Sequence, residues 1–282
     1  MILVTGAAGQ LGVDVLAELE NRNIEYRGTD IAAGVGVDVL DITDATAVSS
    51  YMKELSPSCV IHCAAYTAVD LAEDERELCF RVNELGSENI AMACREVGAE
   101  LFYISTDYVF DGLGSLPYEV DAVKAPISVY GMSKLAGELA VQKHLDKLYI
   151  VRISWVFGHG GNNFVKTMLR LGESKDELNV VGDQVGSPTY TPDLAVLLCD
   201  MVHSGKYGEY HATNEGFCSW AEFAAEIMQK SGNACKINPI TTEQYPTKAT
   251  RPKNSRLSKV SLDEAGFNKL PTWQNALERY LR

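Results

Sequence analysis

The sequence predicts an α/β fold in which a doubly wound parallel sheet is followed by a smaller C-terminal lobe. Three observations support this. Short apolar runs alternate with helical stretches in the first half, a glycine-rich turn joins the first run to the first helix, and the pattern becomes less regular after about Gly158. Such alternation requires right-handed crossovers between parallel strands. We therefore expect a main domain over residues 1–157 and a lobe over residues 158–282, with the chain free to cross between them.

Each expected element follows from its local pattern. Short apolar runs are typical of parallel strands buried on both faces, and we expect such strands at Ile2–Val4, Val60–Cys63, Leu101–Ile104 and Tyr149–Ile153. We expect a further strand, second in the chain, at Glu25–Gly28. Longer stretches with helical spacing predict helices in the first half at Leu11–Asn21, Asp44–Leu55, Arg76–Val97 and Val129–His144. In the second half they predict helices at Asn163–Leu171, Pro192–His203, Ser219–Ser231 and Thr272–Tyr280.

Composition limits the functions that the chain can have. The 282 residues are 46% hydrophobic and 22% charged, which is ordinary for a globular protein. The formal net charge of -13 argues against nucleic acid or an anionic membrane as a partner. No run approaches the roughly 18 apolar residues of a membrane span, and Met1–Thr5 reads directly as a strand. Seven scattered cysteines without a C-x-x-C pair indicate free thiols in a reducing compartment, so we expect a cytoplasmic protein.

The glycine-rich turn is Gly6-Ala7-Ala8-Gly9-Gln10-Leu11-Gly12, between the first strand and the first helix. Glycines at this spacing permit a tight turn, and the helix N-terminus that follows can receive a pyrophosphate. The turn therefore predicts a Rossmann-like dinucleotide site. Asp30 lies where an acid would meet the adenosine ribose, and Asp38, followed by Val39, resembles the acid that approaches the adenine in this arrangement.

A second pattern points to proton transfer. Tyr130 and Lys134 stand four residues apart, so they share one face of a helix, and Ser105-Thr106 lies upstream at the end of a predicted strand. A nearby ammonium favours the phenolate, so we expect Lys134 to lower the pKa of Tyr130 from its usual value of about 10. The set indicates an enzyme that moves a hydride to or from a nicotinamide.

Two further features concern ions. Pro246–Val260 carries five cations and no acid, which favours a site for a small polyanion such as a diphosphate. Metal binding is not predicted, because the histidines are dispersed and His62 lies inside a predicted strand.

The motifs resemble the dTDP-4-dehydrorhamnose reductase family within the extended short-chain dehydrogenase/reductase superfamily. Beyond the glycine loop and Tyr130-x-x-x-Lys134, the resemblance is carried in order by Cys63–Asp70, Ser105–Gly112, Arg152–Gly158, Asn163–Val165, Asp183–Thr189 and Arg251-Pro252. It spans nearly the whole chain. The family pattern often places an aromatic residue before the Ser-Thr pair, whereas Ile104 stands there in this chain, so no aromatic cofactor contact is assigned to it.

The resemblance implies reduction of the 4-keto group of dTDP-4-dehydro-L-rhamnose to dTDP-L-rhamnose, with NADPH or NADH as cofactor. The implied catalytic residues are Thr106, Tyr130 and Lys134. Cofactor contacts are assigned to Gly6, Gly9, Gln10, Leu11, Gly12, Asp30, Asp38, Val39, Ala64, Ala65, Tyr66, Thr67, Tyr130 and Lys134. Substrate contacts are assigned to Thr106, Asp107, Trp155, Asn163 and Arg251. The expected partner is a small nucleotide sugar, with no nucleic acid and no membrane, and the protein is expected to be a monomer or a homodimer.

Two alternatives stay open at this point. One is another sugar-nucleotide enzyme of the superfamily, an epimerase or a 4,6-dehydratase. The dehydratase pattern puts Asp-Glu after the threonine, and here Tyr108 replaces that glutamate. The other is a non-catalytic subunit like the regulatory subunit of methionine adenosyltransferase, which resembles these reductases.

Overall fold

The computed structural model describes residues 1–282, and its centre is a seven-stranded sheet in which every pairing is parallel. The strand order is β11-β6-β5-β4-β1-β2-β3. The strands are β1 (Ile2–Thr5), β2 (Tyr26–Asp30), β3 (Val37–Val39), β4 (Cys59–His62), β5 (Glu100–Thr106), β6 (Leu148–Ile153) and β11 (Gly208–His211). The order reverses between β1 and β4, which makes a crevice at the carboxyl ends of the strands. The predicted fold class is confirmed.

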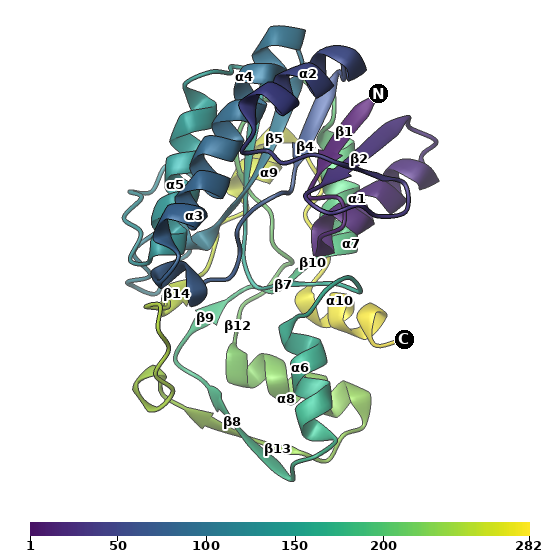
Figure 1. Ribbon diagram of the computed structural model, residues 1–282. Coiled ribbons are helices and arrows are strands. Elements are labelled where there is room, and N and C mark those ends of the chain that lie inside the picture. Colours follow the sequence, from purple (N-terminus) through teal and green to yellow (C-terminus); the bar gives the residue numbers. More distant parts are fainter.

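Helices cover both faces of this sheet (Figure 1). On one face α1 (Gln10–Asn21), α7 (Thr191–Met201) and α9 (Val260–Ala265) bury apolar side chains against the strands. On the other face lie α2 (Ala45–Leu55), α4 (Ser87–Val97) and α5 (Val129–Gln142). The apolar positions of each helix recur at helical spacing, so one stripe of each is buried while the opposite side meets solvent.

A smaller lobe lies below the carboxyl edge of the sheet (Figure 1). Its helices α6 (Phe164–Gly172), α8 (Trp220–Ser231) and α10 (Trp273–Tyr280) share a separate apolar core. Short strands complete it in three small sheets: β8 (Glu177–Val181) with β13 (Lys236–Ile240), β7 (Val156–Phe157) with β10 (Thr189–Tyr190), and β9 (Val185–Gly186) with β12 (Cys218–Ser219) and β14 (Asn254–Ser255). The chain crosses between the two parts, because β11, α7 and α9 lie in the layers of the main sheet.

The structure corrects one predicted helix. Arg76–Val97 was expected as a single helix, whereas it comprises α3 (Arg76–Phe80), the π-helical turn η2 (Arg81–Gly86) and α4. The wider turn carries Asn83, whose buried side chain bonds both the amide and the carbonyl of Tyr66. The spacing of apolar residues does not reveal such a turn, because the helical pattern continues on both sides of it. Turns of this kind are frequent at functional sites.

The remaining elements are short. The 3-10 turns are η1 (Leu71–Glu73), η3 (Asp107–Val109) and η4 (Thr242–Gln244). No helix combines the length and the apolar character that a membrane crossing requires.

Candidate active site

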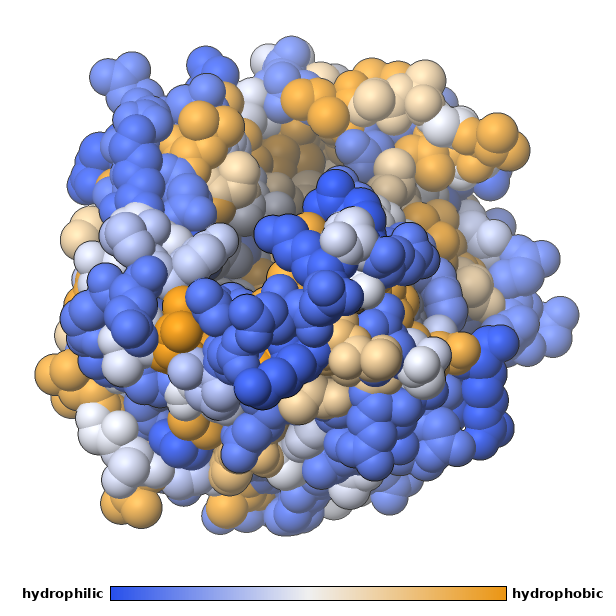
Figure 2. Space-filling view, turned by 90° about the horizontal axis from the view of Figure 1, so that it is seen from below, coloured by the Kyte–Doolittle hydropathy of each residue, from blue (hydrophilic) through white to orange (hydrophobic).

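A cavity of about 810 Å³ opens at the carboxyl ends of β1, β4 and β5. Seen from the side of the smaller lobe, the surface is hollowed, with hydrophilic residues in front of the recess and hydrophobic residues in its depth and along its upper border (Figure 2). Fifteen predicted site residues line the cavity: Gly6, Gly9, Gln10, Leu11, Gly12, Asp30, Ala64, Ala65, Tyr66, Thr67, Thr106, Asp107, Tyr130, Lys134 and Trp155. Asp38, Val39, Asn163 and Arg251 do not line it.

The glycine loop has the geometry that close approach to a phosphate requires. Gly6 has φ +66°, and a Cβ there would lie 2.5 Å from the backbone nitrogen of Ala64. A Cβ on Gly12 would lie 2.2 Å from the carbonyl oxygen of Gly6. Helix α1 begins without a side-chain cap, so the amide N–H groups of Gln10, Leu11 and Gly12 have no acceptor in the protein. These free donors at a positive helix end fit a pyrophosphate.

The adenosine end of the site is only partly as predicted. Asp30 lines the cavity, and its carboxylate accepts the amide N–H groups of Ala8 at 3.0 Å and of Ile31 at 2.7 Å. Asp38 instead accepts a hydrogen bond from the Tyr51 hydroxyl at 2.7 Å. The cavity wall beyond Asp30 is formed by the segment 40–43, which follows β3.

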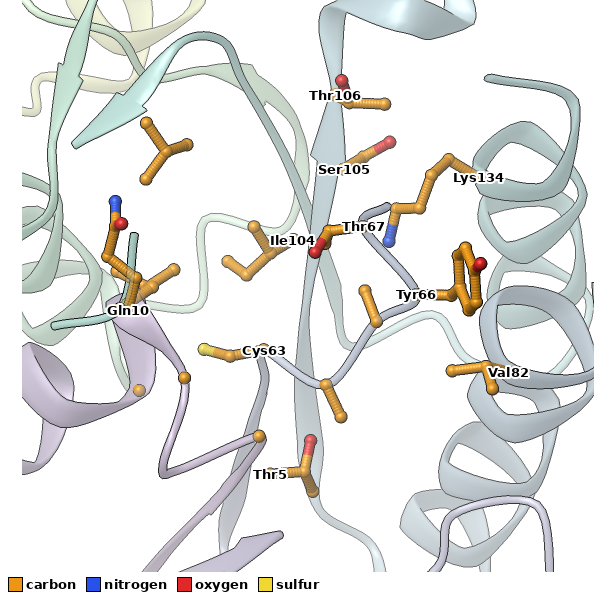
Figure 3. A pocket seen from close by; sticks show the side chains of 18 of the residues that line it. Thr5, Gln10, Cys63, Tyr66, Thr67, Val82, Ile104, Ser105, Thr106 and Lys134 are labelled. Atoms are coloured by element: carbon orange, nitrogen blue, oxygen red, sulfur yellow. The ribbon is translucent and has the colours of Figure 1, made fainter. Parts of the chain in front are cut away.

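The three predicted catalytic residues converge on one wall of the cavity. Thr106 ends β5, while Tyr130 and Lys134 lie one turn apart on α5, whose start is capped by Ser128. In Figure 3 the Lys134 side chain points from α5 across the cavity toward the loop that carries Thr67, and Ser105 and Thr106 stand at the end of the strand. All three side chains are buried. The arrangement provides a phenol, an ammonium and a hydroxyl beside the same space.

The expected effect of Lys134 on Tyr130 is wrong for this structure. Burial raises the pKa of Tyr130, and the Asp107 carboxylate raises it further, whereas a hydrogen bond with Thr106 lowers it. The Lys134 ammonium lies 4.1 Å from the centre of the Tyr103 ring. Burial lowers the pKa of Lys134 to about 8. The i, i+4 spacing placed both groups correctly, but the low-polarity surroundings decide the direction of the shift.

Asp107 is a buried acid at the same wall. Its Oδ1 accepts the Thr106 hydroxyl at 3.0 Å, while its Oδ2 has no hydrogen-bond partner. Burial raises the pKa of Asp107 to about 6, against hydrogen bonds that lower it. An unpaired buried carboxylate oxygen is costly, so it marks a position where a ligand hydroxyl can donate.

Sequence reasoning missed Asn83, which ties the cavity loop to the catalytic helix. Its amide group bonds the backbone of Tyr66, as described above, and donates to the Ser133 hydroxyl at 2.9 Å. Ser133 sits between Tyr130 and Lys134 on α5 and donates to the carbonyl oxygen of Tyr130. The surrounding sequence is mixed, with Arg81 and Glu84 on either side, so no local pattern singled out Asn83.

Trp155 joins the two parts of the protein. It follows β6 with φ +49°, a left-handed conformation that a bulky residue rarely adopts. Its ring stacks on Trp220 of α8 with a centroid separation of 3.7 Å. Asn163 lies nearby in sequence, but its side chain caps α6 by accepting from the amide of Lys166, so it is engaged structurally.

Arg251 lies beside the cavity instead of in its wall. Its guanidinium donates to Asp70 at 2.6 Å and to the hydroxyl of Tyr108 at 3.1 Å, and Tyr108 itself lines the cavity. A second hollow of about 410 Å³ is lined by Arg251 and Lys253. Most cations of the acid-free segment meet acids from elsewhere: besides Arg251 with Asp70, Lys248 pairs with Asp74, Lys253 with Asp183 and Glu243, and Lys259 with Glu215. Arg256 has no acidic partner and donates to the side chain of Asn254.

Other cavity residues were not predicted. They include Thr5, Leu40, Asp41, Ile42, Thr43, Val82, Ile104, Ser154 and Val156. Several of them follow a strand directly, and the ends of neighbouring strands form one edge, so strand ends were the usable signal. No group of three or more His, Cys, Asp or Glu side chains is arranged to hold a metal ion.

Together, the doubly wound sheet, the open glycine loop and the Tyr-x-x-x-Lys pair beside a threonine define the class of extended short-chain dehydrogenases/reductases. The family model described as RmlD substrate binding domain matches residues 1–282, and the chain belongs to that family.

Known relatives match over almost their whole length. The spore coat polysaccharide biosynthesis protein SpsK of Bacillus subtilis is 41% identical over 100% of this chain and 96% of its own. The dTDP-4-dehydrorhamnose reductase of Streptomyces griseus is 43% identical over 98% of this chain and 91% of its own. The solved dTDP-4-dehydrorhamnose reductase of Bacillus anthracis, in complex with NADP, is 44% identical with a TM-score of 0.95, covering 99% of this chain and 97% of that one.

Proposed function

We propose that this chain reduces the 4-keto group of dTDP-4-dehydro-L-rhamnose to give dTDP-L-rhamnose. The observation that carries the proposal is the convergence of Thr106, Tyr130 and Lys134 on the cavity that also receives the open end of α1. Similarity to reductases with this name over the full chain supports the choice of substrate.

The chain's residues have distinct roles in the reaction. Thr106 turns its hydroxyl from Asp107 to the ketone oxygen, donates a hydrogen bond to it and orients it. Tyr130 transfers its phenolic proton to that oxygen as C4 becomes a secondary alcohol. The raised pKa of Tyr130 keeps the phenol protonated at neutral pH, so the proton is present, although it also makes the phenol a weaker acid than one that titrates near the working pH. Lys134 binds the nicotinamide ribose hydroxyls through its ammonium group.

A bound NADPH or NADH supplies the hydride. The free amide groups of Gln10, Leu11 and Gly12 hold its pyrophosphate, and Ala64–Thr67 line the path from the pyrophosphate toward Lys134. Asp30 accepts hydrogen bonds from a free ribose hydroxyl and repels a 2′-phosphate, whereas the similar Bacillus anthracis protein was solved with NADP. We therefore propose that both nicotinamides are accepted.

On the substrate side we propose contacts from Asp107 and Trp155, with Arg251 reaching the diphosphate after its pairing with Asp70 is exchanged. Tyr108 is hydrogen-bonded to Arg251 and replaces the acid that a dehydratase would need for water elimination, which favours simple ketone reduction. The intact catalytic set favours an enzyme over a non-catalytic subunit.

We also propose the cytoplasm as the compartment, and seven free cysteines support a reducing environment. The protein acts as a monomer or a homodimer. Residues 1–157 mainly form the dinucleotide-binding part and residues 158–282 mainly the substrate-binding lobe.

The test is a reduction assay with the purified protein. Incubation with dTDP-4-dehydro-L-rhamnose and NADPH or NADH should consume the nicotinamide absorbance and yield dTDP-L-rhamnose, identified by its NMR spectrum. Parallel incubations with dTDP-glucose and with UDP-glucose test dehydration and epimerisation. Turnover of either control sugar without reduction of the keto sugar would contradict the proposal.

A further inference from the structure

A buried network of charges lies directly behind the catalytic residues. Arg152 of β6 is fully buried, and its guanidinium donates to Glu138 of α5 through Nε at 2.8 Å and through Nη2 at 2.7 Å. The same Nη2 donates to Glu209 of β11 at 2.6 Å. The Glu138 carboxylate accepts a third hydrogen bond, from the Ser105 hydroxyl at 2.5 Å. Ser105 is the residue before Thr106, and its side chain points toward α5 in Figure 3.

Stability alone does not account for this network. Removing a carboxylate and a guanidinium from water costs several kcal/mol per ion, and a well-packed apolar pair often stabilises a core as well or better. What the network provides is position. The planar guanidinium fixes both oxygens of Glu138, and the fixed carboxylate then holds the end of β5 at the residue adjoining Thr106.

Glu138 also lies one helical turn beyond Lys134, on the same side of α5. We propose that Glu138 is a positioning residue of the reaction: it fixes the carboxyl end of β5 through Ser105 and supplies the counter-charge that keeps Lys134 protonated. This inference rests on the proposed reductase function.

The surroundings of Lys134 show why one carboxylate matters. The groups that face its ammonium are Glu138 on the same helix, the Tyr103 ring and Cys79, Cys63 and His62 from the neighbouring elements. Burial lowers the pKa of Lys134 to about 8, and Glu138 is the largest influence that raises it. The pKa of His62 is lowered to about 3 by burial and by Lys134, so this ring is neutral and gives no counter-charge.

The groups around Glu138 itself are Arg152, Ser105, Tyr103 and Lys134. Behind Arg152, Glu209 also accepts from Lys124 at 3.2 Å and from Gln142 at 3.0 Å. The ring of His211 lies 3.4 Å from Nη1 of Arg152, and burial lowers the pKa of His211 to about 3. Glu209 binds the same arginine as Glu138, but it makes no hydrogen bond with Ser105 and is not among the groups that shift the pKa of Lys134.

The test compares four variants by the pH dependence of kcat and by NADPH binding, followed through the fluorescence of the nicotinamide. Glu138→Gln keeps the shape of the side chain but removes its charge, so the pKa of Lys134 falls. The loss of kcat and of NADPH binding at high pH, here called the alkaline limb, should therefore begin about one pH unit lower than in the wild type. At neutral pH, kcat should fall about tenfold because Thr106 is less well fixed. Tyr130 does not cause this limb, since its pKa is raised.

Glu209→Gln is the matched control, because it removes a carboxylate from the same guanidinium. This variant should keep kcat within about twofold of the wild type and leave the alkaline limb at the same pH, because Glu209 is partly exposed to solvent. Glu138→Asp keeps the charge but is one methylene shorter, so it should lower kcat by about tenfold without moving the limb. Ser105→Ala should do the same.

A wild-type alkaline limb in Glu138→Gln, or an equal shift in Glu209→Gln, would overturn the proposal. If Glu138→Gln does not fold, wild-type kcat in both Glu138→Asp and Ser105→Ala would overturn it equally. The NADPH binding profile is measured without the sugar, and the wild type is assayed alongside the variants. A wild type that does not reduce the keto sugar would count against the proposed function. The binding profiles would still decide the role of Glu138.

Discussion

Replacing Lys134 by methionine should make the protein more stable while it abolishes the reaction. The Lys134 side chain is buried, and its pKa is lowered from 10.5 to about 8, chiefly by burial. One pKa unit corresponds to about 1.4 kcal/mol, so the charged side chain destabilises the folded state by about 3 kcal/mol. Methionine gives up the contact of the ammonium with Tyr103, which is worth about 1 kcal/mol, and regains part of it as a sulfur–aromatic contact. The net gain is about 2 kcal/mol.

The sign of the pH dependence follows from the lowered pKa. At about pH 7 the lysine is protonated in both the folded and the unfolded protein, so the whole penalty is present. Between the folded pKa of about 8 and the unfolded value of 10.5, the folded chain has lost its proton while the unfolded chain still holds it, and the wild type therefore gains stability as the pH rises. The advantage of Lys134→Met should shrink by about 2 kcal/mol between about pH 7 and about pH 10.

Thermal unfolding of both proteins at the two pH values measures this directly. For a chain of this size, 2 kcal/mol corresponds to roughly 3–4 °C in Tm, so Lys134→Met should melt by about that much above the wild type at neutral pH. Other groups that titrate in this range, such as Lys259, are common to both proteins and cancel in the difference. A lower Tm for the variant at neutral pH, or a difference that does not change with pH, would refute the reasoning.

Three further predictions concern the site. Tyr130→Phe should reduce turnover by roughly 10²–10⁴, the usual contribution of a positioned acid, without changing the Kd for NADPH; steady-state turnover near that of the wild type would remove Tyr130 from the mechanism. Asp30→Ala should raise the kcat/KM ratio of NADPH to NADH, because two like charges about 4 Å apart cost at most roughly 4 kcal/mol at an effective dielectric of 20, before solvent screening; an unchanged ratio would mean that Asp30 does not face the ribose. Arg251→Ala should raise the KM for the nucleotide sugar and leave the nicotinamide Kd alone, and calorimetry that showed the reverse would contradict its assignment to the diphosphate.

The main sheet was largely predictable because β1, β4, β5 and β6 are buried on both faces and therefore read as short apolar runs, whereas β2 is polar and only partly buried. The strands β1, β2, β4, β5 and β6 were all predicted near their observed positions. The short strand β3 and the edge strand β11 were not. β11 (Gly208–His211) begins with glycine and glutamate, and its apolar content is too low for periodicity to distinguish it from a loop.

The site was predictable where motif spacing and topology agree, and it was not where contacts between distant segments decide. The glycine loop, Thr106 and the Tyr130–Lys134 pair line one cavity, as the sequence indicates. The pairing of Arg251 with Asp70 joins residues that are far apart in sequence, so no local pattern contains it. The direction of the Tyr130 pKa shift depends on the depth of burial, which spacing alone does not give.

Three of the costs that the fold accepts lie at this cavity, although others lie elsewhere, such as the left-handed backbone of Asn23 and Ser56 and the buried ammonium of Lys259. Trp155 has a left-handed backbone, Asp107 keeps an unpaired buried oxygen, and Lys134 is a buried cation with a lowered pKa. Each of these features costs the folded state on the order of 1–3 kcal/mol. The open end of α1 adds amide groups without acceptors. Three such costs and an uncapped helix start around one cavity are what selection for binding and chemistry would leave, so they support the proposal that this cavity is the active site.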